Sequence, residues 1–133
     1  MIQFFVAMTP VGKARARVTS RGTFTPEKTV QAERLIAWEC KKAMSGRKPL
    51  DGAVYLAVEA RFPYPKSWSE KRAIETYWHV AKPDADNLLK VVGDALNKIA
   101  WRDDAQVVEV HVRKRYTHDK RETGLRIDIG HVQ

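Results

Sequence analysis

Residues 53–62, which read AVYLAVEARF, alternate between apolar and more polar side chains. The apolar positions on one side of an extended chain are Val54, Leu56, Val58, Ala60 and Phe62. A repeat of two residues predicts a β-strand with one buried face. A single strand cannot bury that face alone, so the chain needs a sheet and a second layer to cover it.

Three further segments complete the expected sheet. Residues 2–8 are apolar and aromatic, residues 106–116 alternate again, and residues 125–129 form a short closing strand. We expect the last two segments to pair as a C-terminal hairpin at one side of the sheet. On the inward faces we expect Val108, Val110, Val112 and Tyr116 from one strand, and Leu125, Ile127 and Ile129 from the other.

Three helices are expected between these strands, over residues 25–44, within 67–78 and over 86–99. Thr25 as N-cap and Pro26 at the first helical position start the first helix. Ser67 or Ser69 caps the second. The third presents one apolar face, made by Leu88, Val92, Ala95 and Ile99. The chain is therefore predicted to be one α+β domain over residues 1–133, with a mixed sheet of about four strands and three helices.

The charge of the chain points to a polyanionic partner. It has 24 Lys and Arg against 16 Asp and Glu, a formal net charge of +8. Such an excess attracts nucleic acid or an anionic membrane. Most of the candidate phosphate contacts lie in two basic stretches, one of which is expected to be a loop or hairpin after residue 9. The candidates are Lys13, Arg15, Arg17, Arg21, Arg113, Lys114 and Arg115, with Lys120 and Arg121 in addition.

The sequence also indicates where the chain resides. No apolar run approaches the roughly 18–20 residues that a membrane helix requires, and residues 1–13 lack the pattern of a signal peptide. Cys40 is the only cysteine and falls on the apolar stripe of the first helix, so we expect a buried thiol. A reducing, cytoplasmic setting fits these features. Trp68, Trp78 and Trp101 are candidates either for the core or for stacking on unpaired bases.

Aspartates cluster around the third helix. Asp84 and Asp86 stand at its start, Lys90 follows Asp86 by one turn, and Asp103 and Asp104 come after its end. Carboxylates are the ligands that Mg²⁺ prefers, and a neighbouring lysine stabilises charge that develops on a phosphate. A capping aspartate, an ordinary i,i+4 ion pair and a turn are the more common explanation of the same spacing. The spacing alone does not decide between metal binding and a structural role for these aspartates. It also does not show whether Asp104 lies close to Asp84 and Asp86.

The order and spacing of these motifs resemble the RusA family of crossover-junction endodeoxyribonucleases, the Holliday junction resolvases often carried by phages and prophages. The resemblance rests on KPDADNLLKVVGDALN over residues 82–97, on DDAQ at 103–106 before a strand with basic residues, and on PVGKARAR near the N-terminus.

The resemblance implies a function and a set of site residues. Asp84 and Asp86 match the first two catalytic, magnesium-binding aspartates, Asp104 matches the third, and Lys90 matches a lysine that assists at the phosphate. It further implies a homodimer that uses Mg²⁺ to nick two opposed strands of a four-way DNA junction. Two other classes remain open, a non-catalytic nucleic-acid-binding protein and a basic structural protein, since charge alone does not distinguish them.

Overall fold

The computed structural model describes residues 1–14, 17–24 and 26–133, with the side chains of Arg17 and Phe24 excepted. The predicted N-cap Thr25 and the candidate phosphate contact Arg15 lie outside the described residues. The strands are β1 (Ile2–Ala7), β2 (Arg17–Thr19), β3 (Gly22–Phe24), β4 (Val54–Pro63), β5 (Val107–Thr117) and β6 (Gly124–His131). The helices are α1 (Glu27–Met44), α2 (Glu70–Glu75) and α3 (Ala85–Leu96), with short 3₁₀ turns η1 (Asp104–Gln106) and η2 (Lys120–Glu122).

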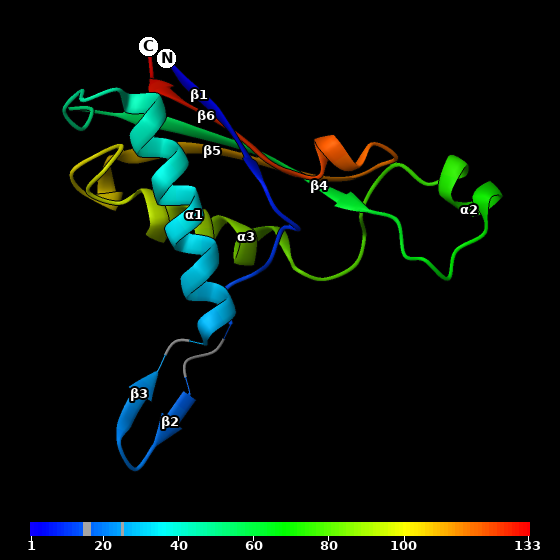
Figure 1. Cartoon of the computed structure of the whole chain (residues 1–133). Helices are drawn as coiled ribbons and strands as arrows, with labels where there is room; N and C mark the ends of the chain where they lie inside the picture. Colours follow the sequence, from blue (N-terminus) through cyan, green and yellow to red (C-terminus); the bar gives the residue numbers. More distant parts are fainter. Residues whose placement is uncertain (15–16, 25) are drawn as a thin grey trace.

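Four strands form one mixed sheet in the order β1-β6-β4-β5. β4 pairs parallel with β5 and antiparallel with β6, and β6 pairs antiparallel with β1. Figure 1 shows α1 and α3 lying together on one side of this sheet. Together with α2, this arrangement confirms the predicted α+β fold with a four-stranded mixed sheet and three helices.

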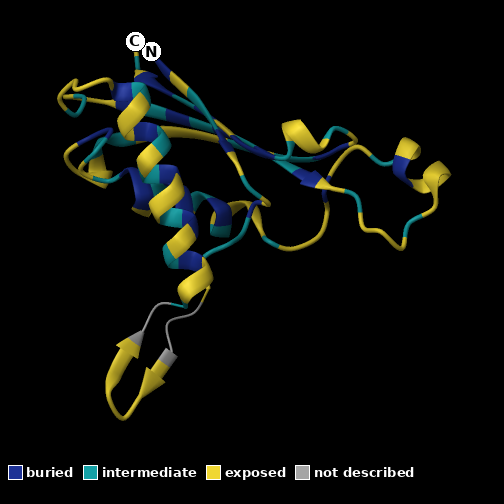
Figure 2. Cartoon of the chain, in the orientation of Figure 1, coloured by how far each residue is buried: buried dark blue, intermediate teal, exposed yellow. Residues whose placement is uncertain are grey.

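The core lies between the sheet and the two longer helices. The alternating residues of β4 are buried, as their period of two predicted. Figure 2 shows the buried stripe of α1 turned toward the sheet. That stripe includes Ile36 and Cys40, which are both fully buried, and burial raises the pKa of the Cys40 thiol to about 11. Trp101 is also fully buried, whereas Trp78 is half exposed, so the candidate tryptophans differ in environment.

The predicted C-terminal hairpin is wrong, because β4 lies between β5 and β6. The chain from residue 64 to residue 106 contains α2 and α3, which is long enough for the crossover that parallel pairing of β4 and β5 requires. β4 therefore takes the centre of the sheet and β5 takes an edge. At this edge Val108 and Val110 are 62% and 48% exposed, although the alternation predicted them inward.

The structure corrects one local prediction and confirms another. α3 ends at Leu96 rather than residue 99, because Asn97 leaves the helical conformation and Lys98 has a positive φ of 71°. The basic segment after residue 9 includes an antiparallel hairpin of β2 and β3, as one of the two predicted alternatives requires. Figure 1 shows this hairpin beyond the N-terminal end of α1.

His79 gives the fold a dependence on pH. The residue is 8% exposed, and its ring stacks on Phe62 with 3.6 Å between the ring centroids. Burial, together with the Lys114 charge, lowers the pKa of His79 below its ordinary value. The unfolded chain then binds more protons than the folded chain as the pH falls below about 6.5, so stability falls with it.

We expect the urea midpoint of the protein to fall between pH 7.5 and pH 5.5. The variant His79→Phe keeps a flat ring on Phe62 without a titrating group, so its midpoint should fall less over the same interval. Urea unfolding followed by circular dichroism at several pH values measures both slopes. Equal slopes for the two proteins would show that His79 does not cause the dependence.

Candidate active site at the head of helix α3

The two aspartates at the start of α3 have free carboxylates. Asp84 is the N-cap residue, but its side chain makes no capping hydrogen bond; only its backbone oxygen accepts the Leu88 N–H, at 3.1 Å. Asp86 lies in the first turn, and both residues are exposed. Within the described residues neither carboxylate has a hydrogen-bond or ion-pair partner. Capping by the Asp84 side chain and an Asp86–Lys90 ion pair therefore do not explain why these residues are acidic.

The surroundings favour negative charge at this position. The N-terminus of a helix carries unpaired N–H groups and a partial positive charge, which offsets repulsion between two neighbouring carboxylates. Lys90 lies one turn further along α3 and is exposed. The head of the helix thus combines two acidic groups with one cation, as the sequence predicted.

Lys114 on β5 fixes the turn that leads into this site. Its ammonium donates hydrogen bonds to the backbone oxygens of Ala81 and Pro83, each at 2.7 Å. These carbonyls lie immediately before Asp84, so the lysine ties the acidic turn to the sheet. In this arrangement the Lys114 ammonium is occupied; its predicted contact with a DNA phosphate stays untested.

A pocket of about 450 Å³ opens beside Asp84. It is lined by residues 10–13, Lys28, residues 82–84 and Asn87. Gly12 packs so closely against the acidic turn that a Cβ there would lie 2.9 Å from the Cβ of Pro83. The N-terminal loop can therefore approach α3 only because residue 12 has no side chain, and this approach forms one wall of the pocket.

Lys13 lies in the same loop and is already paired. Its ammonium contacts Glu33 at 2.8 Å and Asp94 at 3.0 Å. The hydrogen bond that Lys13 donates to Glu33 raises the pKa of Lys13, and the contact with Asp94 raises it further. Because two carboxylates hold this ammonium between α1 and α3, Lys13 links the two helices, and its predicted phosphate contact stays a prediction.

The motif DDAQ, residues 103–106, forms a hydrogen-bonded turn beyond the other end of α3. Asp103 caps η1 by accepting the Ala105 N–H at 2.8 Å. The Gln106 side chain donates to the carbonyls of Leu50 and Gly52 and accepts from the backbone N–H groups of residues 102 and 103. Asp104 Oδ1 accepts from Trp101 Nε1 at 3.0 Å, and the residue is exposed. This motif therefore has a structural role in addition to the predicted catalytic role of Asp104.

The structure does not bring Asp104 to the first pair within one chain. From Asp84 to Leu96 the helix rises about 18 Å, and Asp104 lies beyond its far end. Along β5, Val107 and Lys114 are about 23 Å apart, and Lys114 contacts the turn before Asp84. Among the described residues, no group of three or more His, Cys, Asp and Glu side chains is arranged to hold a metal ion.

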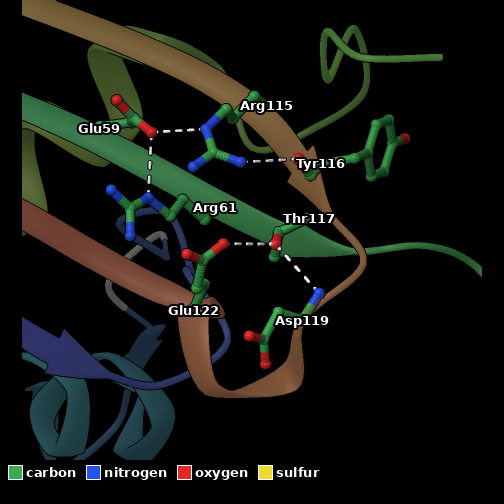
Figure 3. A network of polar contacts seen from close by, with 7 residues as sticks. All are labelled: Glu59, Arg61, Arg115, Tyr116, Thr117, Asp119 and Glu122. Atoms are coloured by element: carbon green, nitrogen blue, oxygen red, sulfur yellow. Dashed lines mark hydrogen bonds and ion pairs between the residues drawn. The ribbon is translucent and has the colours of Figure 1, made fainter.

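The remaining basic candidates differ in how free they are. Arg113, Arg21, Lys120 and Arg121 are exposed. Arg115 is largely buried, because its guanidinium bonds Glu59 and the Tyr116 carbonyl, and Arg61 bonds the same glutamate at 3.0 Å (Figure 3). Burial by itself would raise the pKa of Glu59, but Arg115 and Arg61 outweigh it and lower the pKa.

Sequence reasoning missed Lys28 and Lys82 as neighbours of the acidic pair. Both are exposed and line the pocket beside Asp84. Lys82 stands two residues before Asp84, so the sequence alone could have placed it near the acidic pair. Lys28 comes from the first turn of α1, and only the packing of that turn against residues 10–13 brings it here, so no local pattern marks it.

A free carboxylate pair and a lysine at a helix start, beside a lysine-lined pocket on a basic chain, are typical of enzymes that cleave phosphodiesters with a bound cation. The chain belongs to the RusA endodeoxyribonuclease family, whose model matches residues 7–129. Membership supports nuclease activity on DNA. The chain is also 31% identical over 129 residues to the uncharacterized protein YqaN of Bacillus subtilis (strain 168), covering 90% of this chain and 91% of that protein.

In the part of the chain that the structure describes, no helix combines the length and the apolar character needed to cross a membrane.

The contacts of Lys114 predict a loss of stability when its ammonium is removed. The variant Lys114→Met leaves two backbone carbonyls without a charged donor, which should cost about 1.5–3 kcal/mol in the free energy of unfolding. Lys120→Met, at an exposed position on η2, is the control and should change stability by less than about 0.5 kcal/mol. Urea titration of both variants measures the difference in the free energy of unfolding. Equal losses in the two variants would show that the Lys114 hydrogen bonds do not stabilise the turn.

Proposed function

We propose that this protein is a magnesium-dependent, structure-selective endodeoxyribonuclease that resolves four-way DNA junctions by paired symmetric nicks, in recombination and repair. The observation that carries the proposal is the pair of exposed carboxylates on Asp84 and Asp86, which serve no capping or ion-pair role in the fold. The lysine-lined pocket beside them suits a DNA backbone. The buried, free thiol of Cys40 is consistent with the proposed cytoplasmic setting.

The donor set fits Mg²⁺, which is typically bound by one or two carboxylates together with water and substrate phosphate. Asp84 and Asp86 would hold it. When bound, such a cation lowers the pKa of a coordinated water and neutralises charge on the phosphodiester. Lys90 would stabilise the same developing charge, and Lys28 and Lys82 would bind the backbone on either side of the scissile phosphate.

We further propose that the enzyme acts as a homodimer in which Asp104 serves the partner's site. Asp104 lies beyond the far end of α3 from Asp84, so a third carboxylate from the same chain is out of reach. Two-fold symmetry supplies it twice, once for each site. A four-way junction likewise offers two equivalent scissile phosphates.

The edge of β5 is the interface that we favour for this dimer. Among the described residues, nothing pairs with the outer edge of β5 over residues 107–112, whereas Trp78 forms an antiparallel bridge to Arg115. The exposed Val108 and Val110 lie on the free part. Antiparallel pairing of two copies over residues 107–112, centred between Glu109 and Val110, would carry Asp104 of one chain toward the C-terminal end of β5 in the other. Lys114 lies near that end and contacts the acidic turn.

The first experiment tests the reaction. Purified protein is incubated with a synthetic four-way junction or a matched linear duplex, with Mg²⁺ or with a chelator. We expect paired nicks in the junction alone and only with Mg²⁺. The variant Asp86→Asn should bind the junction as the wild type does, while cleavage falls at least about 100-fold, as when a group that stabilises the transition state is removed.

The outcomes of this experiment separate the alternatives. Equal cleavage of both DNAs would leave a nuclease without junction selectivity. Binding without cleavage by the wild type, with any divalent ion, would favour a non-catalytic DNA-binding protein.

The second experiment tests the shared site by complementation. Asp86→Asn and Asp104→Asn chains are each inactive alone. In a mixed dimer, one site combines the intact Asp86 of one chain with the intact Asp104 of the other. Co-refolded mixtures should therefore regain nicking, to roughly a quarter of the wild-type sites if the chains pair at random. A mixture as inactive as its components would place both residues in the same chain's site.

A further inference from the structure

Tyr77 and Trp78 form an exposed aromatic pair next to the proposed active site. Tyr77 is 50% exposed and Trp78 is 49% exposed, although rings of this size are usually buried. The two rings meet edge to face, with 4.7 Å between their centroids. The fold therefore leaves a large aromatic surface in contact with solvent.

The backbone under this pair is firmly held. The Tyr116 N–H donates to the Tyr77 carbonyl at 2.8 Å, and the His79 N–H donates to the Lys114 carbonyl at 3.1 Å. The buried ring of His79 anchors the next position by stacking on Phe62. Because residues 77–79 are paired with β5, the two exposed rings are presented in a fixed position, and little conformational entropy is lost when a ligand stacks on them.

One free cation accompanies the rings. The guanidinium carbon of Arg113 lies 5.1 Å from the centroid of the Trp78 ring. Arg115 approaches Tyr77 at 5.7 Å, but Glu59 and the Tyr116 carbonyl occupy its guanidinium (Figure 3). Among the ion pairs of the described residues, none includes Arg113, so its charge is available to a phosphate.

We propose that Tyr77 and Trp78 are a stacking surface for an unpaired DNA base, with Arg113 contacting the adjoining phosphate. Exposed aromatic rings with nearby arginine bind nucleobases by their faces. Bases inside a linear duplex are covered by their neighbours, whereas bases at a branch point can be unstacked. The surface therefore selects branched over linear DNA. This inference rests on the proposed function and assigns its selectivity to particular residues.

The position of the pair suits this role. Asp84 is the sixth residue after Trp78, so the two lie at most about 20 Å apart along the chain. That span corresponds to about six base steps along one strand of a duplex. A base held at Trp78 therefore lies within about six nucleotides of a phosphate at the acidic pair.

The test measures stacking separately from cleavage. The probe is a four-way junction that carries 2-aminopurine at its branch point, with the same oligonucleotides as a linear duplex and as a single strand. Binding is measured in chelator, where no cleavage occurs. We expect the wild type to quench the fluorescence of the junction and of the single strand. In Trp78→Ala the quenching should be lost and junction affinity should fall about 5- to 100-fold.

Two further variants control the result. Trp78→Phe keeps an aromatic face and should retain most of the affinity for the junction. Trp38→Ala removes another exposed tryptophan, on α1, where Lys42 lies 5.8 Å from the ring centroid. The variant Trp38→Ala should leave the quenching and the affinity for the junction unchanged. The variant Trp78→Ala should likewise leave the affinity for the linear duplex unchanged. Circular dichroism confirms that each variant is folded.

Two results would overturn the inference. One is equal junction affinity and quenching in the wild type and Trp78→Ala. The other is a change in molecular mass by light scattering in Trp78→Ala with base binding intact, which would make the aromatic pair a contact between two copies. A failure of the proposed nuclease function gives a different pattern, because the wild type would then cut no junction while the single-strand quenching still reports on Trp78.

Discussion

The parallel pairing of β4 with β5 determines where the acidic residues lie. Parallel neighbours need a crossover, and this crossover includes α3, which runs back along β5 before the chain enters that strand. The start of α3 therefore lies beside the end of β5, where Lys114 meets the turn before Asp84. The same geometry sends Asp104 to the opposite end. The pairing of β4 with β5 thus places Asp84 and Asp86 at one end of α3 and Asp104 beyond the other end.

Much of the fold could be predicted from local patterns. The alternation in β4 and the apolar stripes of α1 and α3 report directly which faces are buried, because burial is the main constraint on those positions. Strand order carries no such local signal. Val108 and Val110 alternate like buried residues, yet they lie on an edge, since the number of neighbours of a strand depends on distant segments.

The site shows the same limit. Asp84, Asp86 and Lys90 share one helix start, so their spacing in the sequence places them together. Lys28 reaches the same pocket through the packing of α1 against the N-terminal loop, and the close approach of Gly12 to Pro83 brings that loop against the turn before α3. The distance from Asp84 to Asp104 could not be predicted either, because it depends on the direction in which the chain returns after α3.

The hydrogen bonds of Gln106 have a consequence for the proposed homodimer. One side-chain amide satisfies backbone groups on residues 50, 52, 102 and 103, and thereby joins two loops that precede β4 and β5. Asp104 lies in one of these two joined loops, and its position is therefore held by the sheet. In the homodimer proposed above, a carboxylate on such a stiff support would lose little freedom when it meets the second chain, so more of the interaction energy would remain to hold the two chains in register.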